Sequence, residues 1–195
     1  WLNHTPVVIF AGPGNNGGDA LAVGRMLAED GYQVSVYLFN VHNKLSADCA
    51  ANKKRIIEGK KVKKFVEITL NFDPPQLTAE TLVIDGLFGS GLNKPLAGGF
   101  AAMVKYINQS AAKVVSIDIP SGLMTEDNSN NIHANIIHAD LTLTLQQKKL
   151  SMLMADNQQY LGRLRVLDIR LSQEYIQNAK CRCSILEEQD VRQLL

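Results

Sequence analysis

The sequence predicts an α/β protein with a parallel sheet covered by helices on both faces. Two observations support this fold class: short runs rich in β-branched residues alternate with amphipathic stretches, and glycine-bearing turns follow several of these runs. The chain has 195 residues, 46% of them hydrophobic, which is enough for one domain with a full core.

Seven strands are expected, because seven short apolar runs alternate with helical patterns along the chain. They cover residues 7–11, 34–39, 62–68, 82–85, 114–118, 141–145 and 165–169. A parallel sheet built from them would have all its carboxyl strand ends along one edge.

Three helices are expected between these strands. The first begins near Asp19, whose charge suits the positive end of the helix dipole, and stops near Gly31. A second covers residues 46–58, with Ser46 as a good N-cap and Gly59 at its end, and a third covers residues 100–108. The first helix would turn one apolar face towards the sheet, made up of Leu21, Val23, Met26 and Leu27.

The charge balance argues against nucleic acid and membranes as partners. The formal net charge is +1, so the chain generates no strong overall field, and no apolar run approaches the roughly 20 residues that span a bilayer. One dense basic cluster exists, but no aromatic residues are interleaved to stack bases, so we interpret it as a solvated face. It consists of Lys53, Lys54, Arg55, Lys60, Lys61, Lys63 and Lys64.

The cysteines and histidines indicate neither a disulfide scaffold nor a structural zinc site. Cys49, Cys181 and Cys183 are odd in number and lack C-x-x-C spacing, which fits a reducing, cytoplasmic compartment. No ligand spacing is found among the histidines, which are His4, His42, His133 and His138.

A glycine-rich turn follows the first expected strand and leads into the first helix. Gly12, Gly14 and Gly17 satisfy the pattern G-x-G-x-x-G. Glycines let a ligand approach the backbone, and a helix N-terminus presents unpaired N–H groups, so the turn is a candidate phosphate site. A tight structural turn is the alternative. A dehydrogenase is disfavoured because Asn40 stands where a ribose-binding acid is expected, and no Gly-Lys-Ser/Thr is present for a nucleoside triphosphate.

Two further expected strands end in an acid followed by a glycine-bearing loop. Asp85 precedes residues 86–95 (GLFGSGLNKP), and Asp118 precedes residues 119–122 (IPSG). Such an acid can simply cap the next turn, but two of them beside a third glycine-rich turn favour a site. The side chains expected to converge at the sheet edge are Asn16, Asp19, Asp85, Asp118 and Ser121.

Carboxylates concentrated in one cleft need a cation or a protonated partner. The amide of Asn16, the carboxylate of Asp85 and the hydroxyl of Ser121 form an oxygen set that suits a hard cation rather than zinc. Asp118 is then the candidate general acid or base. Lys94 either holds a phosphate or is solvated in its loop.

At these positions the sequence resembles the YjeF N-terminal family, the NAD(P)H-hydrate epimerases. The matching blocks are residues 11–19 (AGPGNNGGD), 85–95 (DGLFGSGLNKP) and 116–122 (SIDIPSG), with later support from 139–145 (ADLTLTL) and 162–168 (GRLRVLD). The resemblance spans residues 7–171, and its first block is highly specific.

This resemblance implies a three-layer α/β/α Rossmann-like fold and an isomerase that interconverts the R and S epimers of hydrated NADH or NADPH at C6. It implies a potassium ion bound by Asn16, Asp85 and Ser121. The exchange at C6 would follow either loss and return of the hydroxyl or opening and reclosing of the ring. The implied substrate-binding residues are Asn15, Asn16, Gly17, Gly18, Asp19, Gly89, Ser90, Gly91, Leu92, Asn93, Lys94, Pro95 and Asp118.

The departures from the family pattern are modest. Lys94 stands where Arg is more usual, which weakens a bidentate grip on phosphate. The chain starts at Trp1 without the family's usual N-terminal helical segment, and residues 190–195 (DVRQLL) resemble the approach to the dehydratase domain of bifunctional bacterial versions. We therefore expect an epimerase domain at residues 1–185, the start of a linker at 186–195, a homodimer, and fusion to a dehydratase domain in the full-length protein.

The main rival interpretation is a non-catalytic binding module, because related domains serve as dimerising scaffolds in mRNA decapping and as lipoprotein-binding partners. Such a scaffold would not need the polar set at the strand ends, so the catalytic interpretation is favoured. That set is Asn16, Asp19, Asp85, Asp118 and Ser121.

Overall fold

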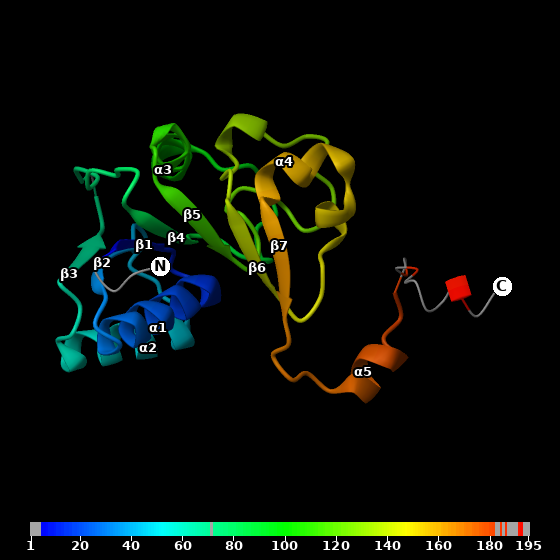
Figure 1. Ribbon diagram of the computed structural model, residues 1–195, viewed down its shortest axis with the longest axis horizontal. Coiled ribbons are helices and arrows are strands. Elements are labelled where there is room, and N and C mark those ends of the chain that lie inside the picture. Colours follow the sequence, from blue (N-terminus) through cyan, green and yellow to red (C-terminus); the bar gives the residue numbers. More distant parts are fainter. Residues whose placement is uncertain (1–4, 71, 182–183, 185, 187–190, 193–195) are drawn as a thin grey trace.

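Seven parallel strands form one sheet in the computed structural model, which describes residues 5–70, 72–181, 184, 186 and 191–192 (Figure 1). The order β3-β2-β1-β4-β5-β6-β7 is that of a doubly wound α/β sheet, extended by a seventh strand. The predicted α/β class is therefore confirmed. The strands are β1 (Pro6–Ala11), β2 (Gln33–Phe39), β3 (Lys64–Ile68), β4 (Leu82–Gly86), β5 (Lys113–Ile117), β6 (Leu141–Leu145) and β7 (Arg163–Leu167).

Helices cover both faces of the sheet, as the three-layer prediction requires. Figure 1 shows α1 (Asn15–Glu29) and α2 (Ala47–Gly59) together on one side and α3 (Gly98–Gln109) on the other. Side chains alternate along each strand, so β1 feeds two separate cores. Val7, Ile9 and Ala11 pack with α1 and α2, whereas Val8 and Phe10 pack with α3.

A third, smaller core lies beyond β5 and is formed by residues of the two connections from β5 to β6 and from β6 to β7. It is made by short elements that the sequence patterns did not predict, because each has too few residues to show a period. These elements are η1 (His133–Asn135), η2 (Leu150–Leu153), η3 (Ala155–Asn157) and α4 (Gln158–Leu161). The last described helix, α5 (Gln173–Asn178), has no buried residue and lies away from the sheet in Figure 1.

The site-bearing edge of the sheet is set by the position of β1. β1 pairs with β2 on one side and β4 on the other, so the chain winds away from β1 in both directions. In sheets of this kind, ligands bind outside the carboxyl strand ends at this reversal. The fold therefore places the loops after β1, β4 and β5 where a ligand is expected.

All seven predicted strands are present, and their ends differ from the predicted ones by at most two residues. The predicted start of α1 near Asp19 is wrong, since the helix begins at Asn15 directly after Gly14. Met26 was also wrongly assigned to the buried face and is 55% exposed. The buried positions of α1 fall on the row that includes Ala20, Leu21, Gly24 and Ala28, and Met26 does not belong to this row.

The second helix begins as predicted but ends differently. Ser46 is its N-cap and accepts a hydrogen bond from the Cys49 N–H at 3.2 Å. Gly59 remains helical, and Lys60 takes the left-handed conformation that ends the helix, with φ of 51°. Gly59 therefore lies one residue before Lys60, the position whose positive φ a glycine would adopt without strain.

The basic cluster runs from α2 through the following connection to the first residue of β3, and Lys53 on α2 forms an ion pair of 2.6 Å with Glu67 on β3. Cys49 and Cys181 are free thiols. His4, Cys183 and most of the predicted linker lie outside the described residues. Within the described ranges, no helix is long and apolar enough to cross a membrane.

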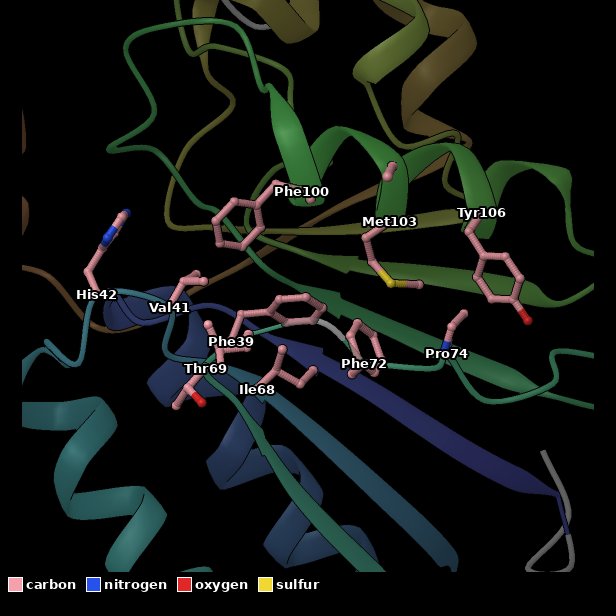
Figure 2. A pocket seen from close by; sticks show the side chains of 13 residues that line it. Phe39, Val41, His42, Ile68, Thr69, Phe72, Pro74, Phe100, Met103 and Tyr106 are labelled. Carbon is pink, nitrogen blue, oxygen red and sulfur yellow. The ribbon is translucent and has the colours of Figure 1, made fainter.

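The α3 face of the sheet carries an apolar groove of about 650 Å³ near the ends of β2 and β3 (Figure 2). Phe39 and Ile68 point into it from the strands, and Phe100, Met103 and Tyr106 point into it from α3. No carboxylate, lysine or arginine lines this groove, and its titratable side chains are His42 and Tyr106.

Candidate functional site

A second cavity, of about 630 Å³, opens at the carboxyl edge of the sheet. It lies between the N-terminus of α1 and the loops after β4 and β5, which is the position that the strand order predicts. The lining residues are Pro13, Gly14, Asn15, Asn16, Asp19, Ser46, Leu87, Phe88, Gly89, Ser90, Gly91, Leu92, Asp118 and Leu145.

Most of the predicted substrate-binding residues line this cavity. Lys94 and Pro95 line an adjoining cavity of about 390 Å³, which shares Pro13, Phe88 and Leu92 with the first. Asn93 is exposed and lines neither. The predicted residues brought together in the larger cavity are Asn15, Asn16, Asp19, Gly89, Ser90, Gly91, Leu92 and Asp118.

Gly17 and Gly18 are buried behind the cavity and do not line it. A Cβ on Gly17 would lie 1.8 Å from the Gly12 carbonyl oxygen, so only glycine lets α1 sit this close to the turn after β1. The glycine-rich motif thus has a packing role here, and a role of these two residues in substrate binding stays a prediction.

The N-terminus of α1 has unpaired donors at the rim of the cavity. Its N-cap is Gly14, which has no side chain to accept hydrogen bonds from the first turn, and no acid stands in that turn. The first N–H groups of the helix therefore remain available to an anion.

Asp85 is completely buried at the end of β4 and is held by four donors. Its Oδ2 accepts hydrogen bonds from the Ser116 hydroxyl at 2.8 Å and from the Ser121 N–H at 2.9 Å. Its Oδ1 accepts from the Ser121 hydroxyl at 2.5 Å and from the Leu87 N–H at 3.3 Å. Burial raises the pKa of Asp85, and these hydrogen bonds oppose that rise.

Asn16 joins this cluster through the loop after β4. Its Nδ2 donates to the Phe88 carbonyl at 2.8 Å, and the Phe88 N–H donates to the Ser121 hydroxyl at 2.9 Å. The predicted ion ligands Asn16, Asp85 and Ser121 therefore lie in one hydrogen-bonded cluster.

The oxygen atoms of this cluster are ligands that suit a hard monovalent cation. Asn16 Oδ1 is buried without a hydrogen-bond partner, and Asp85 forms no ion pair with any described residue. The free amide oxygen, the buried carboxylate and the hydroxyl of this hydrogen-bonded cluster are all oxygen ligands. A cation bound there would compete with the Ser121 hydroxyl for Asp85 Oδ1.

Asp118 follows the last residue of β5 in the left-handed conformation, with φ of 65°. Its N–H donates to the Leu143 carbonyl at 2.9 Å, so the turn is anchored to the neighbouring strand. An Asp in this conformation costs about 1–2 kcal/mol and persists only where the surroundings fix it. The Asp118 side chain lies beyond the end of β5 and lines the cavity.

Lys149 contacts the site through Asp118 and is not among the residues that the sequence predicted. Its ammonium forms an ion pair with Asp118 Oδ1, and both side chains are mostly buried. Lys149 lies in the loop after β6, where the letters QQKK resemble a solvated segment. The available signal was its place just beyond the carboxyl end of the strand next to β5.

Asp19 lies on α1 in the same cavity, and no hydrogen bond or ion pair is formed by its carboxylate within the described part of the chain. Asp19 is exposed at the cavity, but partial desolvation of its carboxylate raises its pKa, and the negative charges of Asp118 and Asp48 raise it further. The cavity therefore holds one acid paired with an ammonium and one acid that binds its proton more tightly than usual. Such a pair can give and take protons.

The sheet and the cavity define a doubly wound α/β domain with an acidic site beside an uncapped helix N-terminus. The family model described as YjeF-related protein N-terminus matches residues 1–151. The chain belongs to this family.

Curated relatives carry related names. An NAD(P)H-hydrate epimerase of Limosilactobacillus fermentum is 33% identical over 171 residues, which are 86% of this chain and 78% of that protein. One from Lentilactobacillus buchneri is 36% identical, over 86% of this chain and 74% of its own length. A bifunctional NAD(P)H-hydrate repair enzyme of Thermofilum pendens is 32% identical over 88% of this chain, and the match covers 33% of that enzyme.

A crystal structure of the yeast protein ynu0 (YNL200c) has the same fold. It superposes with a TM-score of 0.62 at 22% sequence identity, over 85% of this chain and 66% of the yeast chain.

Proposed function

We propose that this chain is an NAD(P)H-hydrate epimerase, which interconverts the R and S forms of hydrated NADH or NADPH at C6 of the nicotinamide ring. The observation that carries the proposal is a mostly buried Asp118 carboxylate at the rim of a cavity whose other acid, Asp19, has a raised pKa. Membership of the family and relatives named for this reaction support it.

The chemistry at C6 needs a proton carrier on the protein. If the hydroxyl leaves, it takes up a proton, the C6–O bond breaks, and the ring nitrogen's electron pair forms a C=N bond. Water then adds to the other face and gives up a proton. If the ring opens instead, the hydroxyl loses a proton and the C6–N bond breaks, with the proton returning to nitrogen. Asp118, with Asp19 in the same cavity, can serve either route.

The remaining parts of the substrate would be held by backbone groups rather than by charged side chains. The pyrophosphate suits the uncapped N-terminus of α1, where the N–H groups and the helix dipole attract an anion. The loop of residues 89–92 forms the opposite wall.

A potassium ion would be held by Asn16, Asp85 and Ser121. It would supply positive charge beside the buried carboxylate and fix the loop after β4 in place. The unpartnered Asn16 Oδ1 supports this assignment. The homodimer, the fused dehydratase domain and the cytoplasmic compartment stay predictions.

The test follows the two hydrate epimers by chromatography, with the wild type and Asp118→Asn side by side. We expect rapid equilibration by the wild type and a loss on the order of a hundredfold or more in the variant, because the amide cannot accept the proton. Equal rates would remove Asp118 from the reaction. A wild type that leaves a pure epimer unchanged would refute the proposed function.

A further inference from the structure

The ammonium of Lys149 is enclosed by oxygen atoms. Besides Asp118 Oδ1, it lies 2.9 Å from the Thr144 hydroxyl, 3.0 Å from the Leu145 carbonyl and 3.2 Å from the Gln147 carbonyl. Its side chain is only 16% exposed. A buried ammonium needs acceptors for its three protons, and the loop after β6 supplies them.

Lys149 reaches Asp118 from outside the 630 Å³ cavity. It lines a neighbouring cavity of about 370 Å³ beside α5, which shares Leu145 with the 630 Å³ cavity that Asp118 lines. A molecule in the larger cavity therefore meets the carboxylate and not the ammonium. Any effect of Lys149 on the reaction must act through Asp118.

The two oxygens of Asp118 have different surroundings. Oδ1 accepts from Lys149, from the Leu145 N–H at 3.2 Å and, at the limit of hydrogen bonding, from the Thr144 hydroxyl at 3.5 Å. Oδ2 accepts nothing from the described part of the chain and is not among the buried unpaired atoms. Oδ2 is therefore the oxygen available to a ligand.

We propose that Lys149 is a positioning residue, whose ion pair holds Asp118 Oδ1 so that Oδ2 faces the cavity as the proton acceptor. This inference rests on the proposed epimerase function and adds a residue outside the glycine-rich and acidic motifs. Lys149 pairs with Asp118, and Asp19, whose pKa is raised by the charge of Asp118, lines the same cavity. Asp19 has no ammonium partner, so uptake and release of the second proton fall to it.

The experiment compares Lys149→Met and Lys149→Arg with Lys148→Met, which removes the charge of the adjacent exposed lysine. Epimer exchange is measured from about pH 5 to 9, giving kcat and KM for each variant. We expect Lys149→Met to lower kcat by on the order of tenfold to a hundredfold with little change in KM. The acidic limb of the pH–rate profile of this variant should move to higher pH, because an unpaired buried carboxylate is protonated more readily.

Lys149→Arg should bring the acidic limb back, and methylammonium added to Lys149→Ala should restore part of kcat, because both return a cation to the pair. Lys148→Met should match the wild type. A Lys149→Met enzyme with the wild-type rate and pH profile would overturn the inference, while an inactive wild type would instead refute the epimerase function.

A double-mutant cycle covers the case in which Lys149→Met folds poorly. Asp118→Asn/Lys149→Met replaces the ion pair by two neutral side chains, and circular dichroism reports its folding. If Lys149 acts through Asp118, the second substitution should cause no further loss of activity in the Asp118→Asn background. Losses that multiply would show an independent role and contradict the proposal.

Discussion

A carboxylate carries protons usefully only when its surroundings set its charge, and the two acids of the cavity have different surroundings. Asp118 contacts the ammonium of Lys149, whereas Asp19 lies on α1 without a cation and faces the charge of Asp118. Two titratable groups held in contrasting environments are typical of sites where one gives a proton and the other takes it.

The raised pKa of Asp19 predicts how the stability of the fold depends on pH. Its pKa is raised in the folded protein, so its favourable contribution is complete below the unfolded-state pKa and is lost as pH rises through the folded-state pKa. Asp19→Asn removes the ionised form. The melting temperature of the variant relative to the wild type should therefore be higher at pH 8 than at pH 3.5, as measured by thermal unfolding.

Asp127 is a control in which the pKa shift, and therefore the pH dependence of stability, has the opposite sign. Hydrogen bonds from Ser129 lower the pKa of Asp127, so its contribution is present above the unfolded-state pKa and lost as pH falls. Asp127→Asn should then be relatively less stable at pH 8 than at pH 3.5. The same pH trend in both variants would contradict this account.

At the scale of single elements, the N-termini of α1 and α2 differ in their capping. α2 is capped by the Ser46 side chain, and its start lies beside the cavity. α1 has no side-chain cap at all, which leaves its N–H groups for a ligand at a cost in helix stability. The end of α1 that faces the cavity is left without a side-chain cap, and the adjacent helix is capped by a serine.

The C-terminus of α2 is a place where stability can be gained. Lys60 ends the helix with a positive φ that disfavours any residue with a Cβ. Lys60→Gly should stabilise the fold by about 1 kcal/mol, because glycine adopts this conformation without strain. Chemical denaturation measures the change. Lys61→Gly, one residue further and without a positive φ, is the matched control and should give no gain; equal gains would refute the argument.

At the scale of the whole molecule, the site is an assembly of segments far apart in the chain. Asn16 lies on α1, Asp85 ends β4, and Ser121 lies in the loop after β5. They meet because β1, β4 and β5 are neighbours in one parallel sheet and end at the same edge. Whatever binds this cluster joins three parts of the fold.

A cation at the cluster should therefore stabilise the whole domain. Replacing tetramethylammonium by potassium at constant ionic strength should raise the melting temperature, by about 2–4 °C for each kcal/mol of binding free energy, and should raise epimerase activity. Asn16→Ala should lose the thermal response, because it removes the unpartnered oxygen. Asn15→Ala, its neighbour outside the cluster, should keep it. A wild-type melting temperature indifferent to the exchange would exclude the ion site.

The sequence by itself determined the parts that depend on local patterns. Buried strands are recognisable as apolar runs, Ser46 as an N-cap, and Asp85 and Asp118 as acids at strand ends, because these signals extend over a few residues. Once the strands are parallel, their carboxyl ends must share an edge, so the meeting of Asn16, Asp85 and Ser121 could be predicted without coordinates.

Only the tertiary structure decided which side chains touch. Lys149 is 31 residues from Asp118 and stands beside an equivalent-looking Lys148, so no local pattern distinguishes the buried lysine from the exposed one. The start of α1 at Asn15 likewise depends on the close approach of Gly17 to Gly12. Hydrophobic periodicity reports which face of an element is buried, whereas an ion pair depends on where packing brings two distant loops together.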